Sequence, residues 1–427
     1  MKLSTLSASC ALLAACGLWP AAAQTCPRDS DAAALYLPLD EAVARALASD
    51  LRPAAARAAV SAARAERAIA TLKPADTVSL GFENFPGSGL AAEIENLEVS
   101  GTFNRVWERG GKRDARTALA ERGVEIAEAS VDISRADIAY EIQALYVELV
   151  LTQERASLAA ERLAASRDAE ALIRKRVEAA RDPLLAGSRA AADALMAEGE
   201  LARLTEDAET LRAALADFWG GAVDFGVDVC GLSPDGKHGE HALDVRNSPE
   251  LARIEAERRQ AQAAIRLAEA ERIPDVTWSA GVRKFGTDES LGILGGVSVP
   301  LGAPKRAAAF EQKAGAQARQ LEADADALRQ SLLRESARLE RTALGAAGAL
   351  ARIDTGPLPE AERAVALAND GYARGAFSYL DVLDAQKLLF DLREQRLDFL
   401  RTYHLAEAAL ARLQARNLPA SLLESAQ

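Results

Sequence analysis

Two long stretches of the chain repeat apolar residues with the alternating four-and-three spacing of a coiled-coil seam. From Lys112 to about Arg181 nothing breaks the helical pattern, which corresponds to roughly 100 Å of helix at 1.5 Å per residue. The first seam comprises Ile138, Ile142, Leu145, Leu149, Thr152, Ala156, Ala159 and Leu163, and the second comprises Leu389, Leu392, Phe399, Tyr403, Ala406, Leu410 and Leu413, with Arg396 interrupting it. The spacing predicts antiparallel hairpins of coiled-coil helices, far too long for a compact domain.

Four segments of about ten residues show partial alternation of apolar and polar positions, which is typical of β-strands. They are DTVSLGFENF and IENLEVSGTF in the first half, and DVTWSAGVRKF and LGILGGVSVPL in the second. PGSG and GTDES lie between the members of each pair and supply the turn residues of two hairpins. This length suits a tilted membrane strand, and an ordinary soluble hairpin is the alternative. Lipid does not tolerate open sheet edges, so four strands could form a barrel only together with other chains.

The same order of elements occurs twice. A shift of 200 residues aligns Leu51 with Leu251 and Pro74 with Pro274, and later Asp182-Pro183-Leu184 corresponds to Phe377-Ser378-Tyr379. The expected division begins with a signal peptide at 1–23 and ends with a tail at 417–427. The first repeat, at 24–229, contains strands at about 76–103 and a helical hairpin at about 112–219. A linker at 230–246 leads to the second repeat, at 247–416, which contains strands at about 275–301 and a hairpin at about 306–415. The fold class is therefore mainly α with a small β part.

Composition supports long helices and excludes two classes of function. Hydrophobic residues make up 49% of the 427 residues but aromatic residues only 5%, because alanine supplies much of the apolar content. Alanine favours helix and fills little volume. The net charge of −12 argues against a nucleic-acid surface, which needs a basic patch. The chain has no Ser/His/Asp set, P-loop or Rossmann glycine pattern in its required context, so we expect neither an enzyme nor a cofactor.

The N-terminus has the features of an export signal. Lys2 provides a positive start, an apolar stretch follows, and PAAAQ offers a small-residue cleavage site after Ala23. LAAC, which ends at Cys16, is the alternative, because Cys16 would be the acylated residue of a lipoprotein box. No later run of 18 apolar residues predicts a membrane-spanning helix. Both readings place the mature protein outside the cytoplasm.

Two pairs of side chains outside the helical segments are weaker candidate sites. Cys26 and Cys230 would meet an oxidising compartment after export, and we expect them to form a disulfide that ties the N-terminal arm to the linker. The alternative is two unrelated thiols. His238 and His241 have a spacing that could hold a metal ion, but two histidines in a polar loop are more often simply solvated.

Several phrases of the sequence, taken in this order, resemble one protein family. SPEL at 248–251, ERIPDVTWSAGVRKF at 271–285, SVPLG at 298–302 and ERGGKR at 108–113, within a duplicated chain, resemble the TolC-like outer membrane efflux proteins, and most closely their CzcC-type cation-efflux branch. The resemblance implies a homotrimer. Three chains of four strands would form a twelve-stranded β-barrel in the outer membrane, continued by a periplasmic α-helical tunnel.

The resemblance also implies a function. Family members are exit ducts of tripartite pumps, so the expected partners are a periplasmic adaptor, an inner-membrane transporter of the resistance-nodulation-division type and outer-membrane lipid, with no nucleic acid. The CzcC branch implies export of heavy-metal cations. The alternatives are a duct for drugs or other organic solutes and, in a different class, a periplasmic adaptor or coiled-coil scaffold.

The stretch YARGAFSYLDVLDAQ resembles the periplasmic gate of this family. The expected gate residues are Tyr372, Gly375, Phe377, Asp381 and Asp384, with the two aspartates on one helical face. The family also uses a basic residue between the glycine and the first aspartate; this chain has none there, so an aromatic plug is expected to replace it in part. The expected adaptor-docking tips are Asp182 and Pro183 of the first repeat and Gly375 and Ser378 of the second.

Overall fold

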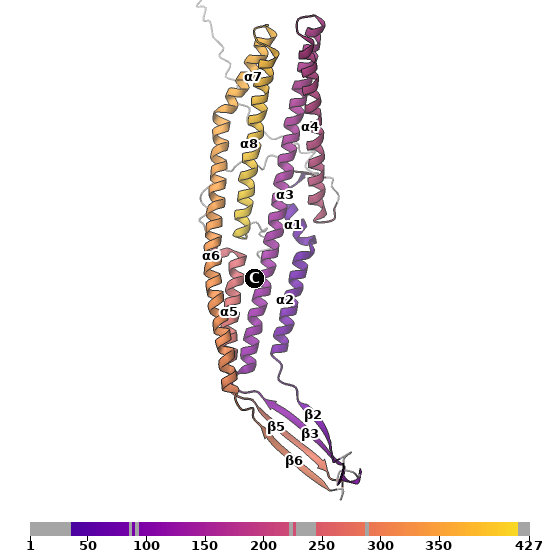
Figure 1. The fold of residues 1–427 in the computed structure, drawn as a ribbon, viewed down its shortest axis with the longest axis vertical. Helices are drawn as coiled ribbons and strands as arrows, with labels where there is room; N and C mark the ends of the chain where they lie inside the picture. The colour runs from indigo at the N-terminus through magenta and orange to yellow at the C-terminus, as the bar shows by residue number, and fades with distance from the viewer. Residues whose placement is uncertain are drawn as a thin grey trace, which may run out of the picture.

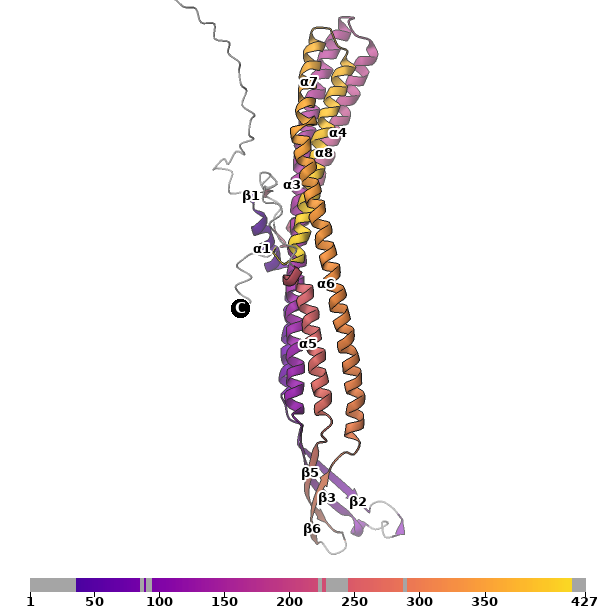
Figure 2. The ribbon, with the colours of Figure 1, turned by 90° about the vertical axis from the view of Figure 1, so that its left-hand side faces the viewer.

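The protein is an elongated bundle of helices with a small β-sheet at one end (Figure 1). The computed structural model describes residues 36–84, 88–89, 94–221, 225–227, 245–286 and 290–416. Two helical hairpins end at the opposite pole from the sheet, and a view turned by 90° shows the same polarity (Figure 2). Within the described residues, none of the helices is long and apolar enough to cross a membrane.

The first half runs from a short strand through two helices to the sheet and the first hairpin. Its elements are β1 (Tyr36–Leu37), α1 (Leu39–Ser49), α2 (Leu51–Ala70), β2 (Thr77–Glu83), β3 (Glu98–Trp107), α3 (Lys112–Glu178) and α4 (Leu184–Asp217). The helical segment before the strands is divided at Asp50, whose backbone is extended and whose carboxylate accepts a hydrogen bond from the Arg52 amide at 2.7 Å. Asp50 thus ends α1 and caps α2.

The second half repeats this order. Its elements are β4 (Gly226–Val227), α5 (Pro249–Ala270), β5 (Val276–Lys284), β6 (Leu291–Ser298), α6 (Ala303–Thr355), α7 (Pro357–Ala373) and α8 (Tyr379–Leu413). The expected single long helix of the second hairpin is interrupted at Gly356-Pro357, because proline lacks the amide hydrogen and its ring collides with the preceding turn. Figure 1 shows that α7 is tilted relative to α6 beyond this break. The residue boundaries of the two repeats stay a prediction.

The predicted seams lie mainly in two separate cores, one within each half of the chain. The core between the hairpins is a third cluster, in which Val147 and Leu151 of α3 pack with Leu350 of α6 and with Leu397 and Leu400 of α8. In α3, the seam residues Ile138, Ile142 and Leu149 are fully buried, and Ala159 and Leu163 are each 7% exposed. In α8, the course of the seam differs from the prediction. Arg396 lies outside it and pairs with Asp354 of α6 at 2.7 Å, whereas Leu397 and Leu400 are buried.

The four long strands form one antiparallel sheet in the order β2-β3-β5-β6. The register places Val78 opposite Phe103, Phe103 opposite Ala280, and Ala280 opposite Gly295, so these positions share one face. That face is apolar except for Arg105 and Lys284, and it includes Val78, Leu80, Phe82, Val99, Phe103, Trp107, Val276, Trp278, Val282, Leu291, Ile293 and Val297. The opposite face is mostly serine, threonine, asparagine, glycine and charged residues, with Val106 and Leu294 as exceptions.

Apart from Val276 at the helical end, most of the apolar face is left uncovered by the described chain. Ile293 is 92% exposed and Val78 is 75% exposed. A soluble protein rarely leaves so large a contiguous apolar surface in contact with water. The division into one apolar and one polar face is instead the pattern of a strand that faces lipid on one side and a water-filled interior on the other.

Candidate functional site: the tips of the two hairpins

Both hairpins turn with the same backbone geometry. At the first tip the Arg181 amide donates to the Arg176 carbonyl at 2.8 Å, and at the second the Ala376 amide donates to the Gly371 carbonyl at 2.8 Å. Each turn has one residue in the left-handed region, Ala180 with φ 54° and Gly375 with φ 77°. These are Schellman-type helix ends, in which glycine is the usual left-handed residue. The correspondence of the two tips thus extends to their hydrogen bonds, and Ala180, not Asp182-Pro183, stands at the position of the glycine.

We expect Ala180→Gly to stabilise the first tip by about 1 kcal/mol, because a Cβ is disfavoured in the left-handed region. Gly375→Ala is the matched change in the opposite direction at the second tip. Hydrogen exchange measures both, since about 1 kcal/mol of local opening free energy is about a fivefold change in exchange rate. The Arg181 amide should exchange more slowly in the first variant and the Ala376 amide faster in the second; equal rates in parent and variants would contradict the assignment.

A cluster of three side chains joins the two tips. Asp182 accepts two hydrogen bonds from the guanidinium of Arg176, at 2.8 Å from Nε and 3.1 Å from Nη2. It also accepts a hydrogen bond from the Tyr372 hydroxyl of the second hairpin at 3.1 Å. The Arg176 guanidinium carbon lies 4.8 Å from the centre of the Tyr372 ring, within range of a cation–π interaction. We call these three residues the tip cluster.

The environment of the tip cluster keeps Asp182 ionised and the Tyr372 hydroxyl protonated. The Arg176 guanidinium holds the pKa of the Asp182 carboxyl below its usual range, because its hydrogen bonds stabilise the carboxylate. Tyr372 is only 5% exposed, and burial raises the pKa of its hydroxyl, which therefore remains a donor at neutral pH. The neighbouring Tyr379 ring lies 6.1 Å from Tyr372, and burial raises the pKa of Tyr379 to about 12.

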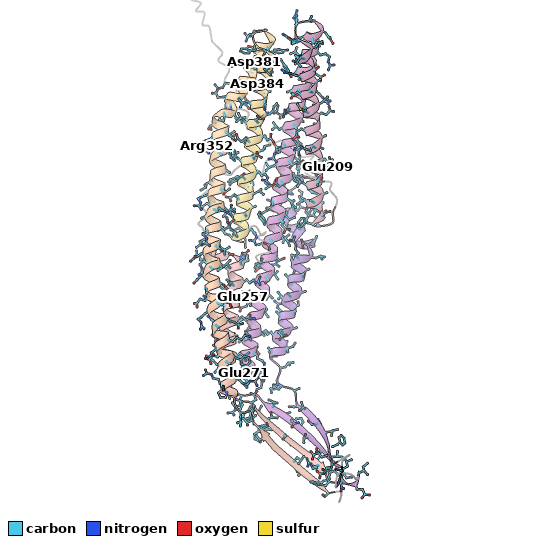
Figure 3. The ribbon with its side chains drawn as sticks, viewed as in Figure 1. Glu209, Glu257, Glu271, Arg352, Asp381 and Asp384 are labelled. Atoms are coloured by element: carbon cyan, nitrogen blue, oxygen red, sulfur yellow. The ribbon has the colours of Figure 1, made fainter. Side chains whose placement is uncertain are left out.

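The two aspartates expected at the gate, Asp381 and Asp384, lie near the start of α8 but differ in their surroundings (Figure 3). Asp381 belongs to a capping box, in which its Oδ2 accepts from the Ser378 amide at 2.8 Å and from the Ser378 hydroxyl at 2.7 Å. These hydrogen bonds lower the pKa of Asp381. Asp384 is exposed and lines a cleft of about 230 Å³ together with Asp193 of α4. Of these two aspartates, Asp381 caps α8, and Asp384 is exposed to the solvent and has no capping role.

Phe377 occupies a different position from a free aromatic plug. Its side chain is 49% exposed, and its ring covers Gly371, where an added Cβ would overlap the ring. Among the expected gate residues, Tyr372 is the aromatic side chain that forms a hydrogen bond to the first hairpin. Pro183 and Ser378 occupy equivalent places as the residues that precede α4 and α8.

Arg176 was not predicted from the sequence. It supplies a cation to the hairpin tips from the end of α3, whereas the basic residue of the family pattern was sought between Gly375 and Asp381. Asp182 and Tyr372 are 190 residues apart in the chain. The sequence offered one signal for this contact: the shift that aligns the two tips places the last turns of α3 and α7, and so Arg176 and Tyr372, in equivalent regions of the two repeats. Cys16, Cys26, Cys230, His238 and His241 lie outside the described residues.

Comparison with known proteins agrees with this architecture. Residues 244–416 match the family described as outer membrane efflux protein. The chain is 30% identical over 317 residues to the cobalt-zinc-cadmium resistance protein CzcC of Cupriavidus metallidurans, covering 72% of this chain and 75% of that protein. It is 29% identical to the nickel-cobalt-cadmium resistance protein NccC of Alcaligenes xylosoxydans xylosoxydans, covering 69% of each.

Solved structures share the fold. A crystal structure of CusC matches with a TM-score of 0.75 at 17% identity, covering 88% of this chain and 91% of that one. The outer membrane protein VceC of Vibrio cholerae matches with a TM-score of 0.70 at 20% identity, covering 88% and 96%. Together with the identity to CzcC, these findings confirm the fold expected from the duplicated pattern. The chain belongs to the outer membrane efflux protein family, in its CzcC-type branch.

Proposed function

We propose that this outer-membrane efflux protein is the exit duct for heavy-metal cations in a tripartite efflux system. Its partners are a periplasmic adaptor and an inner-membrane transporter of the resistance-nodulation-division type. The observation that carries the proposal is the sheet, whose apolar face is uncovered while its other face is polar. The relatives CzcC and NccC are named for resistance to cobalt, zinc, cadmium and nickel, and this supports metal cations as the cargo. We assign no catalytic activity to the chain.

The proposed functional unit is a homotrimer. The edge strands β2 and β6 each pair on one side only within the described chain, and open edges are not tolerated in lipid. Pairing β2 of one chain with β6 of the next would close a twelve-stranded barrel, with the polar face inward. The helices would then continue as a tunnel, with the hairpin tips around its far opening.

The tip cluster is the proposed clasp of that opening. It joins Tyr372 of the second hairpin to Asp182 of the first, and thereby holds the two tips together. Arg176 takes the part of the missing basic residue, because it neutralises Asp182 and covers the Tyr372 ring. Asp384, exposed on the first turns of α8, is the proposed carboxylate that attracts cations, and the tips themselves are the proposed adaptor-docking surface.

Ala280→Arg should reduce insertion into the outer membrane, because arginine on the lipid face near the middle of a strand costs about 2–4 kcal/mol. Ser279→Arg is the matched control, since Ser279 is the next residue on the same strand and lies on the polar face. Cell fractionation and the amount of heat-resistant trimer on gels without boiling measure the effect. Recovery of the parent as a soluble protein would contradict the proposed function, as would equal insertion of the two variants.

A further inference from the structure

The boundary between sheet and helices carries a surplus of positive charge. Lys73 lies between α2 and β2, Arg109 lies between β3 and α3, and Lys305 and Arg306 lie in the first turn of α6. All four side chains are exposed, and none of the four forms a salt bridge within the described part of the chain. We call these four residues the basic rim. The whole chain has a net charge of −12, so this surplus is a local feature.

Other cations at the same boundary are already neutralised. Arg105 pairs with Asp76 at 2.7 Å, Lys112 with Asp275 at 2.9 Å, and Arg116 with Glu108. Glu271, at the end of α5, is a second partner of Lys112 (Figure 3). The carboxylates of this boundary are therefore largely occupied. The positive charge of the basic rim is therefore available to an anion from outside the chain.

The basic rim borders the apolar face of the sheet directly. Trp107 ends β3 on that face with 59% of its surface exposed, and Arg109 follows two residues later. Leu301, which is 95% exposed, follows β6 and precedes Lys305 by four residues. An exposed tryptophan and leucine next to cations is the arrangement of a protein surface at the level of lipid headgroups, where the apolar parts enter the acyl region.

The first turn of α6 is also positively charged. It contains Lys305 and Arg306 and no acidic residue, although the positive end of a helix dipole favours negative charge. The corresponding turn of the first repeat contains Lys112 and Arg113 together with Asp114, and its Lys112 is neutralised by Asp275. The second repeat thus retains a positive charge that the first repeat neutralises internally.

We propose that the basic rim binds anionic phospholipid headgroups of the periplasmic leaflet, while the adjacent apolar face lies in the acyl chains. The proposal rests on the membrane position of the sheet proposed above. Its occupant is a phospholipid with a negatively charged headgroup. Zwitterionic lipid lacks the net charge that the rim requires, and free inorganic phosphate lacks the acyl chains that the apolar face and Leu301 would contact.

The test compares lipids added to the purified full-length protein in detergent. Phosphatidylglycerol should raise the midpoint of thermal unfolding more than phosphatidylcholine, and about 0.5 M NaCl, where the Debye length falls to about 4 Å, should remove the difference. In Lys305→Gln/Arg306→Gln, apparent affinity for phosphatidylglycerol should fall about fivefold for each charge removed, since each cation near an anionic surface contributes about 1 kcal/mol. The variant Lys313→Gln/Arg319→Gln is the control, because it removes the same charge from exposed positions further along α6.

Three outcomes would overturn the proposal. The first is an equal response of the two double variants to phosphatidylglycerol. The second is equal stabilisation of the parent by phosphatidylcholine, which would show that only the apolar face takes part. The third is the same rise with inorganic phosphate, which would assign the rim to a free anion. The salt dependence of the parent keeps the test decisive if a variant fails to fold. Failure of the proposed function would instead appear as loss of outer-membrane location, which this assay does not measure.

Discussion

Replacing Asp182 with alanine is expected to raise the resting conductance of the channel in planar bilayers about tenfold or more. Asp182 accepts hydrogen bonds from Arg176 of its own hairpin and from Tyr372 of the other. A hydrogen bond to a charged group contributes about 1.5–3 kcal/mol, and partial exposure to solvent reduces this to about 1–2 kcal/mol. About 1.4 kcal/mol corresponds to a tenfold change in an equilibrium constant, and the contact is repeated in each proposed subunit.

Two controls separate clasp breakage from a general effect of charge. Asp381→Ala removes the same charge at the same end of the molecule, but its hydrogen bonds are to Ser378 of its own hairpin, so conductance should change much less. Tyr372→Phe removes only the cross-hairpin hydroxyl and should open the channel partially. The combination Asp182→Ala/Tyr372→Phe should resemble Asp182→Ala alone, because the two residues share one interaction. Parent-like conductance of Asp182→Ala would mean that the tips are held elsewhere.

The same carboxylate sets the pH range in which the clasp holds. The pKa of Asp182 is lowered in the folded protein, so its contribution is present above the ordinary value of 3.8 and is lost as pH falls through the folded pKa. The parent channel should therefore be closed near neutral pH and should open only as pH falls below 3.8 and through the folded pKa of Asp182. Asp182→Ala should lack this acid-dependent step in a conductance titration.

Asp275→Ala is expected to destabilise the junction of sheet and bundle by about 3 kcal/mol. Lys112 is only 5% exposed, and its ammonium lies 2.9 Å from Asp275 Oδ1. The same oxygen accepts a hydrogen bond from the Arg109 amide at 3.1 Å, so one carboxylate fixes the start of α3 to the start of β5. Removing one partner of a buried pair leaves an uncompensated charge, which costs about 3–5 kcal/mol. We expect the low end of this range, because Asp275 is partly exposed and Lys112 would keep Glu271 as a second partner.

Lys112→Met is the informative comparison. It removes the buried charge and keeps an apolar side chain of similar length, so the loss of stability should be much smaller than in Asp275→Ala. Denaturant unfolding of the detergent-solubilised protein measures both changes. If Lys112→Met proved as harmful as Asp275→Ala, the ion pair itself, and not an unpaired buried charge, would determine the stability of the junction.

Local periodicity predicted the larger elements. The spacing of Ile138, Ile142 and Leu149 is enough to define a helix face, and all three are fully buried. The alternation of apolar and polar positions predicted the strands, and the register places Val78, Leu80 and Phe82 on one face. The break at Gly356-Pro357 followed from the chemistry of proline and was missed, because the alanine-rich pattern continues on both sides of it.

The candidate site was less accessible to sequence analysis. Turn chemistry and resemblance identified the region of Tyr372 and Gly375, but no local rule connects Tyr372 to Asp182 or indicates that Arg176 joins them. That contact depends on two hairpins meeting at their ends. The capping role of Asp381 could have been predicted, since Ser378 precedes it by three residues, the spacing of a capping box.

Deletion of the gene, followed by measurement of metal tolerance and intracellular metal content, tests the central claim most directly. Zinc, cobalt, cadmium, nickel and copper would be compared with dyes and detergents, and a plasmid-borne copy would restore the protein. We predict that deletion lowers tolerance to at least one of these metals and raises its content in the cell, that the parent gene restores both, and that dye and detergent tolerance stay unchanged. Unchanged metal tolerance together with sensitivity to dyes would contradict the account and assign the duct to organic solutes.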